Sequence, residues 1–205
     1  MKKSLIIASA IASMVTIGSA SSALAKTQGH YVGINVLRSS ASNQYKSSSI
    51  IASNYSKFND SSIGFGADYK YAFNFDKIFL SPGVFFDKLG LESQDQDGDS
   101  VSSDYRYGAK IDLGYDITDD FSLYITSGIA KTGYDVDWKS SGQKESGSKI
   151  GYLAGIGASY NISESIALNL EYNSQSIDFK TPDNGGINKV TSDIRAIKFG
   201  ASYQF

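Results

Sequence analysis

Apolar and polar residues alternate strictly along several stretches of the chain. From Tyr105 to Ile117 every odd position is apolar or aromatic, while the even positions are Arg, Gly, Lys, Asp, Gly and Asp. Successive side chains of a strand point to opposite faces, so a period of two predicts a strand and not a helix. The pattern recurs and predicts eight strands, at residues 32–36, 63–73, 78–87, 105–117, 121–130, 150–162, 166–172 and 197–205. The registers of the third strand, which contains Pro82, and of the fifth stay open.

The connections between these strands alternate between short and long. The short ones are residues 74–77, 118–120 and 163–165, and the long ones are residues 39–62, 88–104, 131–149 and 173–193. Tight turns at one end and long loops at the other are typical of outer-membrane barrels. The predicted fold is therefore all-β, an eight-stranded antiparallel up-and-down transmembrane β-barrel with short periplasmic turns and long extracellular loops.

The size of the side chains predicts which face of the barrel points inward. The interior of an eight-stranded barrel is just filled by side chains. The Tyr, Phe, Ile and Leu residues of the apolar face would overfill it, whereas the Gly, Ser, Asn and few charges of the other face suit a narrow polar lumen. We therefore expect the apolar face to meet lipid, where a closed barrel is permitted because every backbone group is paired. A soluble periplasmic ligand-binding barrel, with its apolar face inside, is the alternative.

Aromatic residues gather near both ends of the predicted strands, which is typical of interfacial girdles. Those near the short turns are Tyr31, Tyr71, Phe73, Tyr115, Phe121, Tyr160, Tyr203 and Phe205, and those near the long loops are Phe86, Tyr105, Tyr107, Tyr152 and Tyr172.

The first residues have the pattern of a secretory signal peptide. Lys2 and Lys3 precede an apolar stretch from residue 5 to about residue 18, followed by Ala23-Leu24-Ala25 as a cleavage pattern. Residues 1–25 are therefore expected to be removed, which leaves residues 26–205 as one barrel domain. Without Lys2 and Lys3 the 19 basic residues become 17, against 21 acidic residues, which argues against a nucleic-acid partner.

The signal peptide, the eight alternating segments, the asymmetry of the connections and the C-terminal aromatic residue together give a recognisable pattern. It resembles the small eight-stranded outer-membrane proteins of Gram-negative bacteria, the OmpX-like and opacity-type surface antigens with a porin-like β-barrel domain. The resemblance covers essentially the whole chain after Ala25. It implies insertion among outer-membrane lipids, and it implies that Tyr203 and Phe205 form the C-terminal signal that the barrel-assembly machinery recognises.

Charged residues also occur on the predicted inward face. They are Asp68, Lys70, Arg106, Lys110, Asp112, Asp116, Glu171 and Lys198. An unpaired buried charge is costly, so we expect these residues to form a salt-bridge network that closes the lumen. A narrow ion-conducting, porin-like channel is the alternative.

Few residues suggest chemistry. His30 is the only histidine and stands at the start of the first strand, so a lipid-modifying enzyme at the barrel rim is a further alternative. No catalysis and no cofactor are predicted, because no nucleophile and acid accompany this histidine in sequence. The acidic stretch from Asp95 to Ser100 departs from the EF-hand spacing and is expected to be a solvated loop, with weak calcium binding as the alternative.

The predicted long loops contain aromatic residues in a background of Ser, Gly and Asn. They are Tyr45, Tyr55, Phe58, Tyr134, Trp138 and Phe179. Rigid aromatic rings among small polar residues are typical of adaptable binding surfaces, so these are candidate contacts to a host or surface macromolecule. The alternative is that the rings continue the hairpins or rest on the barrel rim. The predicted function is surface interaction, such as adhesion, or membrane integrity.

Overall fold

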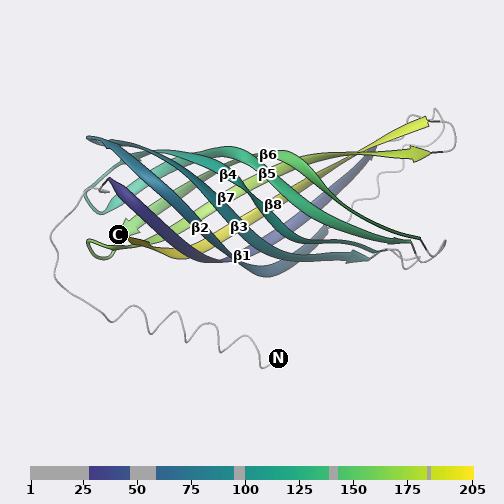
Figure 1. Cartoon of the computed structure of the whole chain (residues 1–205), viewed down its shortest axis with the longest axis horizontal. Helices are drawn as coiled ribbons and strands as arrows, with labels where there is room; N and C mark the ends of the chain where they lie inside the picture. Colours follow the sequence, from purple (N-terminus) through teal and green to yellow (C-terminus); the bar gives the residue numbers. More distant parts are fainter. Residues whose placement is uncertain (1–27, 47–58, 95–99, 139–142, 184–185) are drawn as a thin grey trace, which may run out of the picture.

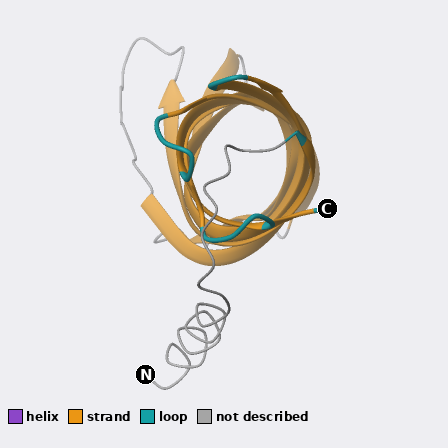
Figure 2. Cartoon of the chain, turned by 90° about the vertical axis from the view of Figure 1, so that its left-hand side faces the viewer, coloured by secondary structure: helices purple, strands orange, loops and turns teal. Residues whose placement is uncertain are grey.

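The chain forms one closed barrel of eight strands. The computed structural model describes residues 28–46, 59–94, 100–138, 143–183 and 186–205. The strands are β1 (Gly29–Lys46), β2 (Asn59–Phe75), β3 (Ile78–Gln94), β4 (Ser100–Asp116), β5 (Phe121–Trp138), β6 (Gln143–Asn161), β7 (Ile166–Asp183) and β8 (Gly186–Gln204). Each strand pairs antiparallel with its sequence neighbours, and β1 pairs with β8 to close the barrel (Figure 1; end-on in Figure 2). The predicted fold class is confirmed. The described residues include no helix of the length and apolarity needed to span a membrane.

Alternation along each strand determines which side chains face outward. On β5, Ile125 and Ile129 are exposed on the outer face, whereas Thr126 and Ala130 are buried inside. The stretch with an outward-facing apolar side runs from Ile197 on β8 to Phe205 directly after it, and its nine residues match the roughly 9–11 that a tilted strand needs to cross a bilayer. The prediction of an apolar outer face is confirmed, and the alternative of a barrel with its apolar face inside is wrong.

The two predicted groups of aromatic rings lie on the outer face, with one exception. Phe73, Tyr115, Tyr160, Tyr203 and Phe205 are exposed at one end, and Phe86, Tyr105, Tyr107, Tyr152 and Tyr172 toward the other. Tyr31 is the exception, because it is only 3% exposed and points inward, where its hydroxyl donates to Gln204 Oε1 at 2.8 Å. Its place beside the outward Val32 explains the error, since neighbouring residues of a strand cannot share a face.

The strands are longer than the sequence indicated, and the extra length lies at one end. They contain 17 to 19 residues and continue into all four predicted long loops. We call this the loop end and the opposite end, with its three tight turns and the C-terminus, the turn end (Figure 1). Beyond the apolar band the side chains on both faces of a strand are polar, as at Ser39 and Ser40, so apolar and polar residues no longer alternate in the sequence. The backbone hydrogen bonds between the strands nevertheless continue there. The β7–β8 ladder, for example, continues to the pair Asp183 and Gly186.

Two seams interrupt the ladder at the loop end. Pairing of β2 with β3 ends at Phe65 and Lys88, and pairing of β6 with β7 ends at Tyr152 and Ser176. The β7–β8 hairpin therefore leaves the barrel apart from the β5–β6 hairpin (Figure 1). At the first seam β3 has a bulge after Lys88, in which Gly90 takes a φ of 62°, a left-handed conformation that a β-branched residue does not adopt without strain.

Candidate functional site

Buried charges fill the middle of the lumen. Lys110 Nζ lies 2.5 Å from Glu171 Oε2 and 3.7 Å from Asp112 Oδ1, and Lys70 Nζ lies 3.2 Å from Asp112 Oδ2. Lys70 lies on β2, Lys110 and Asp112 on β4, and Glu171 on β7, all at inward positions. Two of the three pairs therefore cross the lumen, and the third joins successive inward residues of β4. The attraction of each pair offsets the cost of removing its charges from water.

A second group of charges centres on Asp87 of β3. Arg106 donates to Asp87 Oδ2 through Nε at 3.2 Å and Nη2 at 2.7 Å, and Lys198 donates to Oδ1 at 2.7 Å. Both carboxylate oxygens are thus used by cations from β4 and β8. Asn173 connects the two groups, because its Oδ1 accepts from Arg106 and its Nδ2 donates to Glu171 at 2.7 Å. A single network of hydrogen bonds and ion pairs therefore ties five strands together across the interior: β2, β3, β4, β7 and β8.

The structure brings six of the eight predicted inward charges into these ion pairs: Lys70, Arg106, Lys110, Asp112, Glu171 and Lys198. Asp68 is half-buried and accepts a hydrogen bond from Asn35 Nδ2 at 3.4 Å. Asp116, also expected inside, is buried. Sequence reasoning missed Asp87, although its period-two relation to Ser81 and Gly83 on the same strand would have placed it inward. Pro82 obscured that strand's register.

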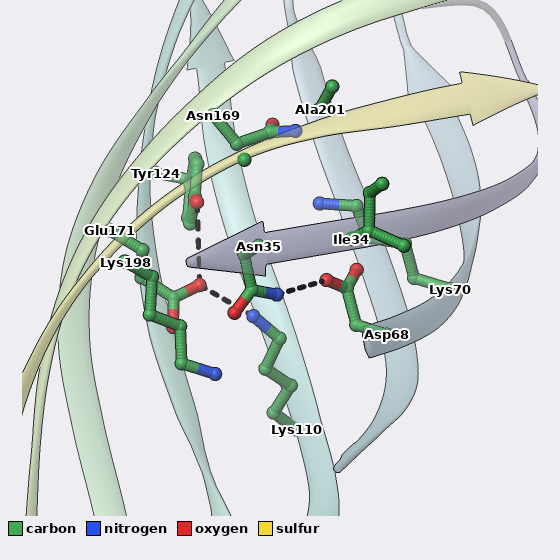
Figure 3. A pocket seen from close by; sticks show the side chains of 11 residues that line it. Ile34, Asn35, Asp68, Lys70, Lys110, Tyr124, Asn169, Glu171, Lys198 and Ala201 are labelled. Carbon is green, nitrogen blue, oxygen red and sulfur yellow. Dashed lines mark hydrogen bonds and ion pairs between the residues drawn. The ribbon is translucent and has the colours of Figure 1, made fainter. Parts of the chain in front are cut away.

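Little space remains between these side chains. Figure 3 shows the cavity lined by Asn35, Asp68, Lys110, Tyr124 and Glu171 among others, with charged and polar tips pointing into it. Its volume is about 30 Å³, which is room for about one water molecule. The lumen at this level does not hold a substrate or a continuous column of water.

Apolar side chains close the lumen toward the loop end. Leu37, Leu89, Leu91, Ile177 and Ile194 form a buried cluster contributed by β1, β3, β7 and β8. Leu89 continues the inward parity of Phe85 and Asp87, and the Leu89 carbonyl accepts a hydrogen bond from Ser39 Oγ at 3.2 Å. This apolar plug was not expected from the sequence, because most of its members fell in stretches assigned to loops or next to them.

His30 lies in an aromatic cluster at the turn end. Its ring stacks on Phe205 with centroids 5.7 Å apart, meets Tyr71 edge-on at 4.8 Å, and its Nδ1 lies 2.6 Å from the Tyr69 hydroxyl. Among the described residues no carboxylate or serine hydroxyl is recorded in contact with this ring, so the geometry resembles an interfacial contact and not a nucleophile–base pair. The cluster links the C-terminal residue to β1 and β2.

Most of the candidate loop residues lie outside the described residues or in strand ends whose side chains are not described. Tyr55 and Phe58 lie outside the described residues, and Tyr45, Trp138 and Phe179 lie in β1, β5 and β7 with side chains that are not described. Tyr134 is half-buried, and its ring occupies the space over the backbone of Gly147 on the neighbouring strand.

The acidic stretch lies largely outside the described residues as well, since only Ser100 of residues 95–100 is described. Across the described ranges no group of three or more His, Cys, Asp or Glu side chains is arranged to hold a metal ion.

The family model for the outer membrane protein beta-barrel domain matches residues 9–205. The chain belongs to this family. Its fold is also similar to OprG from Pseudomonas aeruginosa, with 16% identity over 88% of this chain and 98% of that one, at a TM-score of 0.55. A second similar structure is Ail, the attachment invasion locus protein of Yersinia pestis, in complex with the heparin analogue sucrose octasulfate, with 17% identity over 87% and 100% of the chains at a TM-score of 0.50. No match was found among curated proteins.

Membership of the outer-membrane barrel family gives the exposed apolar band its physical setting. In water such a band would be an unusually large apolar patch, whereas in the outer membrane of a Gram-negative cell it contacts lipid. Bacterial barrels of this kind have short periplasmic turns and longer external loops. The turn end of this barrel is therefore expected on the periplasmic side, and the loop end outside.

Proposed function

We propose that this barrel is a surface-interaction protein that binds an extracellular macromolecule through the hairpins of its loop end and performs no catalysis. The observation that carries the proposal is the small lumen cavity, because about 30 Å³ leaves no room for transport through the interior. With the lumen filled and the outer band facing lipid, the polar surface available to a partner is at the two ends.

The loop end offers much more of this surface than the turn end. Strands of 17 to 19 residues exceed the roughly 9–11 needed to cross a bilayer, which leaves about seven or eight residues of each strand beyond the lipid. At about 3.3 Å per residue and a tilt near 40°, these hairpins project about 20 Å from the membrane. Strand pairing continues to the ends of the hairpins, as for Trp138 with Gln143. The paired backbone is therefore already ordered, and the hairpins would lose little conformational entropy when a partner binds.

The register offers a precise way to shorten a hairpin. Ile177 of β7 lies opposite Ser192 of β8, and Lys131 of β5 lies opposite Ile150 of β6. Joining either pair through Asn-Gly removes the projecting hairpin and closes the strands with a favoured two-residue turn. The barrel inside the membrane keeps its strands in both variants.

Attachment of cells that display the full chain or a shortened chain tests the proposal. Bacteria producing equal surface amounts of each protein are incubated with cultured epithelial cells, with soluble heparin as a competitor in one arm because Ail binds a heparin analogue. Attachment should fall with at least one shortened hairpin and remain with a variant altered only in the periplasmic turn at Asp119. Unchanged attachment after shortening both hairpins would contradict the proposal.

A further inference from the structure

Beyond the lipid the barrel wall divides into two separate sheets. Strands β3, β4, β5 and β6 stay paired to their loop-end tips, as Gln94 with Ser100 and Trp138 with Gln143 show. Strands β7, β8, β1 and β2 form the other sheet, since β7 pairs with β8 to its tip and β8 pairs with β1. The two seams described above separate the sheets, so each sheet ends in two strand edges (Figure 1).

The β6 edge is the longest of these edges in the described part of the chain. There β6 pairs with β7 only from Tyr152 onward, whereas it pairs with β5 from Gln143 onward. Residues 143–151 therefore have a strand on one side only, and an exposed edge of this kind is a template for pairing with another strand. The β7 edge contains Pro182, which has no N–H to donate, and the bulge at Gly90 bends the β3 edge.

The charges of the β6 edge complement a second copy of the same edge. The segment from Glu145 to Lys149 reads Glu-Ser-Gly-Ser-Lys, which is symmetric about Gly147 except that its two ends carry opposite charges. When two such strands pair antiparallel about Gly147, Glu145 of each copy lies opposite Lys149 of the other. Opposite charges in opposed positions stabilise a strand pair, and like charges destabilise it. In a parallel pair with each residue opposite its own copy, both pairs of charges would repel.

The β5–β6 hairpin itself does not compensate these two charges. The Lys149 side chain is exposed, and among the side chains that the structure describes none forms an ion pair with it. Thr132 lies opposite Lys149 on β5, and Val136 lies opposite Glu145. Both charged positions are therefore available to a strand that adds on the other side of β6.

The direction of β6 determines how two copies can meet. The strand runs from the loop end to the turn end (Figure 1). In two barrels of one membrane the β6 strands run the same way, so their edges cannot pair antiparallel, whereas in two barrels of facing membranes they run in opposite ways. Gly147 lies five residues beyond Tyr152 of the loop-end aromatic group, or about 13 Å along the membrane normal. The facing membranes would then be about 25 Å apart.

We infer that the barrel binds a second copy of itself in a facing membrane, through antiparallel pairing of the two β6 edges centred on Gly147. The sheets from β3 to β6 of the two copies join into one continuous sheet. Main-chain hydrogen bonds hold the two edges together, and the two pairs of Glu145 with Lys149 select the antiparallel orientation. The inference rests on the proposed function, because it names a partner of the loop-end hairpins, and that partner is the chain itself.

Clustering of vesicles that contain the full barrel tests the inference. The barrel is refolded into phosphatidylcholine vesicles, cleavage by added trypsin checks that the loop ends face outward, and light scattering follows clustering. Sedimentation in a neutral detergent measures the dissociation constant of the dimer. The variants are E145K, K149E and the exchange variant E145K/K149E, and the heat-dependent shift of gel mobility checks that each is folded. D135K is the matched control, because Asp135 is an exposed charge of the same hairpin on a strand that is paired on both sides.

Wild-type vesicles should cluster. E145K and K149E should each weaken the dimer about 30-fold, because each substitution turns both attractive pairs into repulsive ones. The exchange variant should bind as the wild type does, and vesicles of E145K should cluster with vesicles of K149E although neither clusters alone. D135K should behave as the wild type. An exchange variant that does not recover binding would overturn the inference.

The inference and the proposed function fail in different experiments. Vesicles contain no host macromolecule, so wild-type vesicles that stay apart would overturn the inference alone, while attachment to epithelial cells still tests the proposed function. Dimers that sediment in detergent while the vesicles stay apart would also overturn it, because the two copies would then not pair across facing membranes. Loss of clustering by E145K with attachment to epithelial cells unchanged would support self-association as a separate use of the β6 edge.

Discussion

Asp87 should be the most sensitive single position of the barrel interior. Its two carboxylate oxygens accept hydrogen bonds from Arg106 and from Lys198, and all three side chains are buried. Replacing Asp87 by Asn keeps the shape of the side chain and removes its charge. Two buried cations then lose the carboxylate that they share.

The expected loss of stability follows from the cost of an uncompensated buried charge. Removing one partner of a buried ion pair costs about 3–5 kcal/mol, and here one carboxylate serves two cations. We therefore expect the free energy of unfolding to fall by at least about 3 kcal/mol in Asp87→Asn. Asp119→Asn in the exposed β4–β5 turn is the matched control and should change stability by less than about 0.5 kcal/mol.

A second substitution separates loss of charge balance from loss of packing. Lys198→Met removes one of the two cations, and its sulfur can pack on the ring of Phe85, over which the Lys198 ammonium now lies at 4.8 Å. In the Asp87→Asn background it should recover at least half of the lost stability, which a double-mutant cycle would measure as a favourable coupling.

Urea unfolding of the barrel in lipid vesicles, followed by circular dichroism and by the fraction that keeps its folded gel mobility, gives these values. If Asp87→Asn were as stable as Asp119→Asn, the two cations would not depend on this carboxylate and the account of the lumen would be refuted. If Lys198→Met made Asp87→Asn still less stable, the loss would come from packing and not from charge.

Other parts of the structure give further predictions. Leu89→Ala in the apolar plug should cost about 2–5 kcal/mol in urea unfolding, because Leu89 is fully buried. Gly64→Val should abolish the folded gel mobility, since the Lys88 carbonyl occupies the place where its Cβ would lie. Phe205→Ala should reduce insertion into the outer membrane of cells more than Phe75→Ala, an equally exposed aromatic residue at the same end, if the terminal residue serves as an assembly signal. The wild type should show no steady conductance in planar bilayers, because the lumen cavity holds about one water molecule.

The strands inside the membrane could be predicted because lipid imposes the alternation. Where one face must be apolar and the other polar, as from Tyr105 to Ile117, the sequence shows the period of two directly. Beyond the lipid both faces of a strand are polar, so the sequence from Ser39 to Lys46 looks like a loop although β1 continues through it. The hydrogen-bond ladder that extends the strand has no signature in side-chain polarity.

The inward position of most charges could be predicted, but their pairing could not. Lys110 and Glu171 are 61 residues apart in sequence and meet across the lumen, so their distance depends on the register of strands that are not neighbours. The apolar plug was hidden for a different reason. Leu89 and Leu91 share the inward parity of Asp87, but inward apolar residues run against the pattern of a polar interior, and both fall in the stretch that the sequence assigned to a loop.

The accessibility of single thiols along β5 tests the central claim, that the barrel crosses the membrane with an apolar outer face and a filled lumen. The chain contains no cysteine, so each variant from Leu123 to Ile129 carries one nitroxide label after refolding into vesicles. High collision rates with oxygen are expected at odd positions such as Ile125, and low rates with both oxygen and a water-soluble nickel complex are expected at even positions such as Thr126. Strong contact of the Thr126 label with the nickel complex would reveal a water-filled lumen, and the absence of a period of two would contradict the membrane barrel itself.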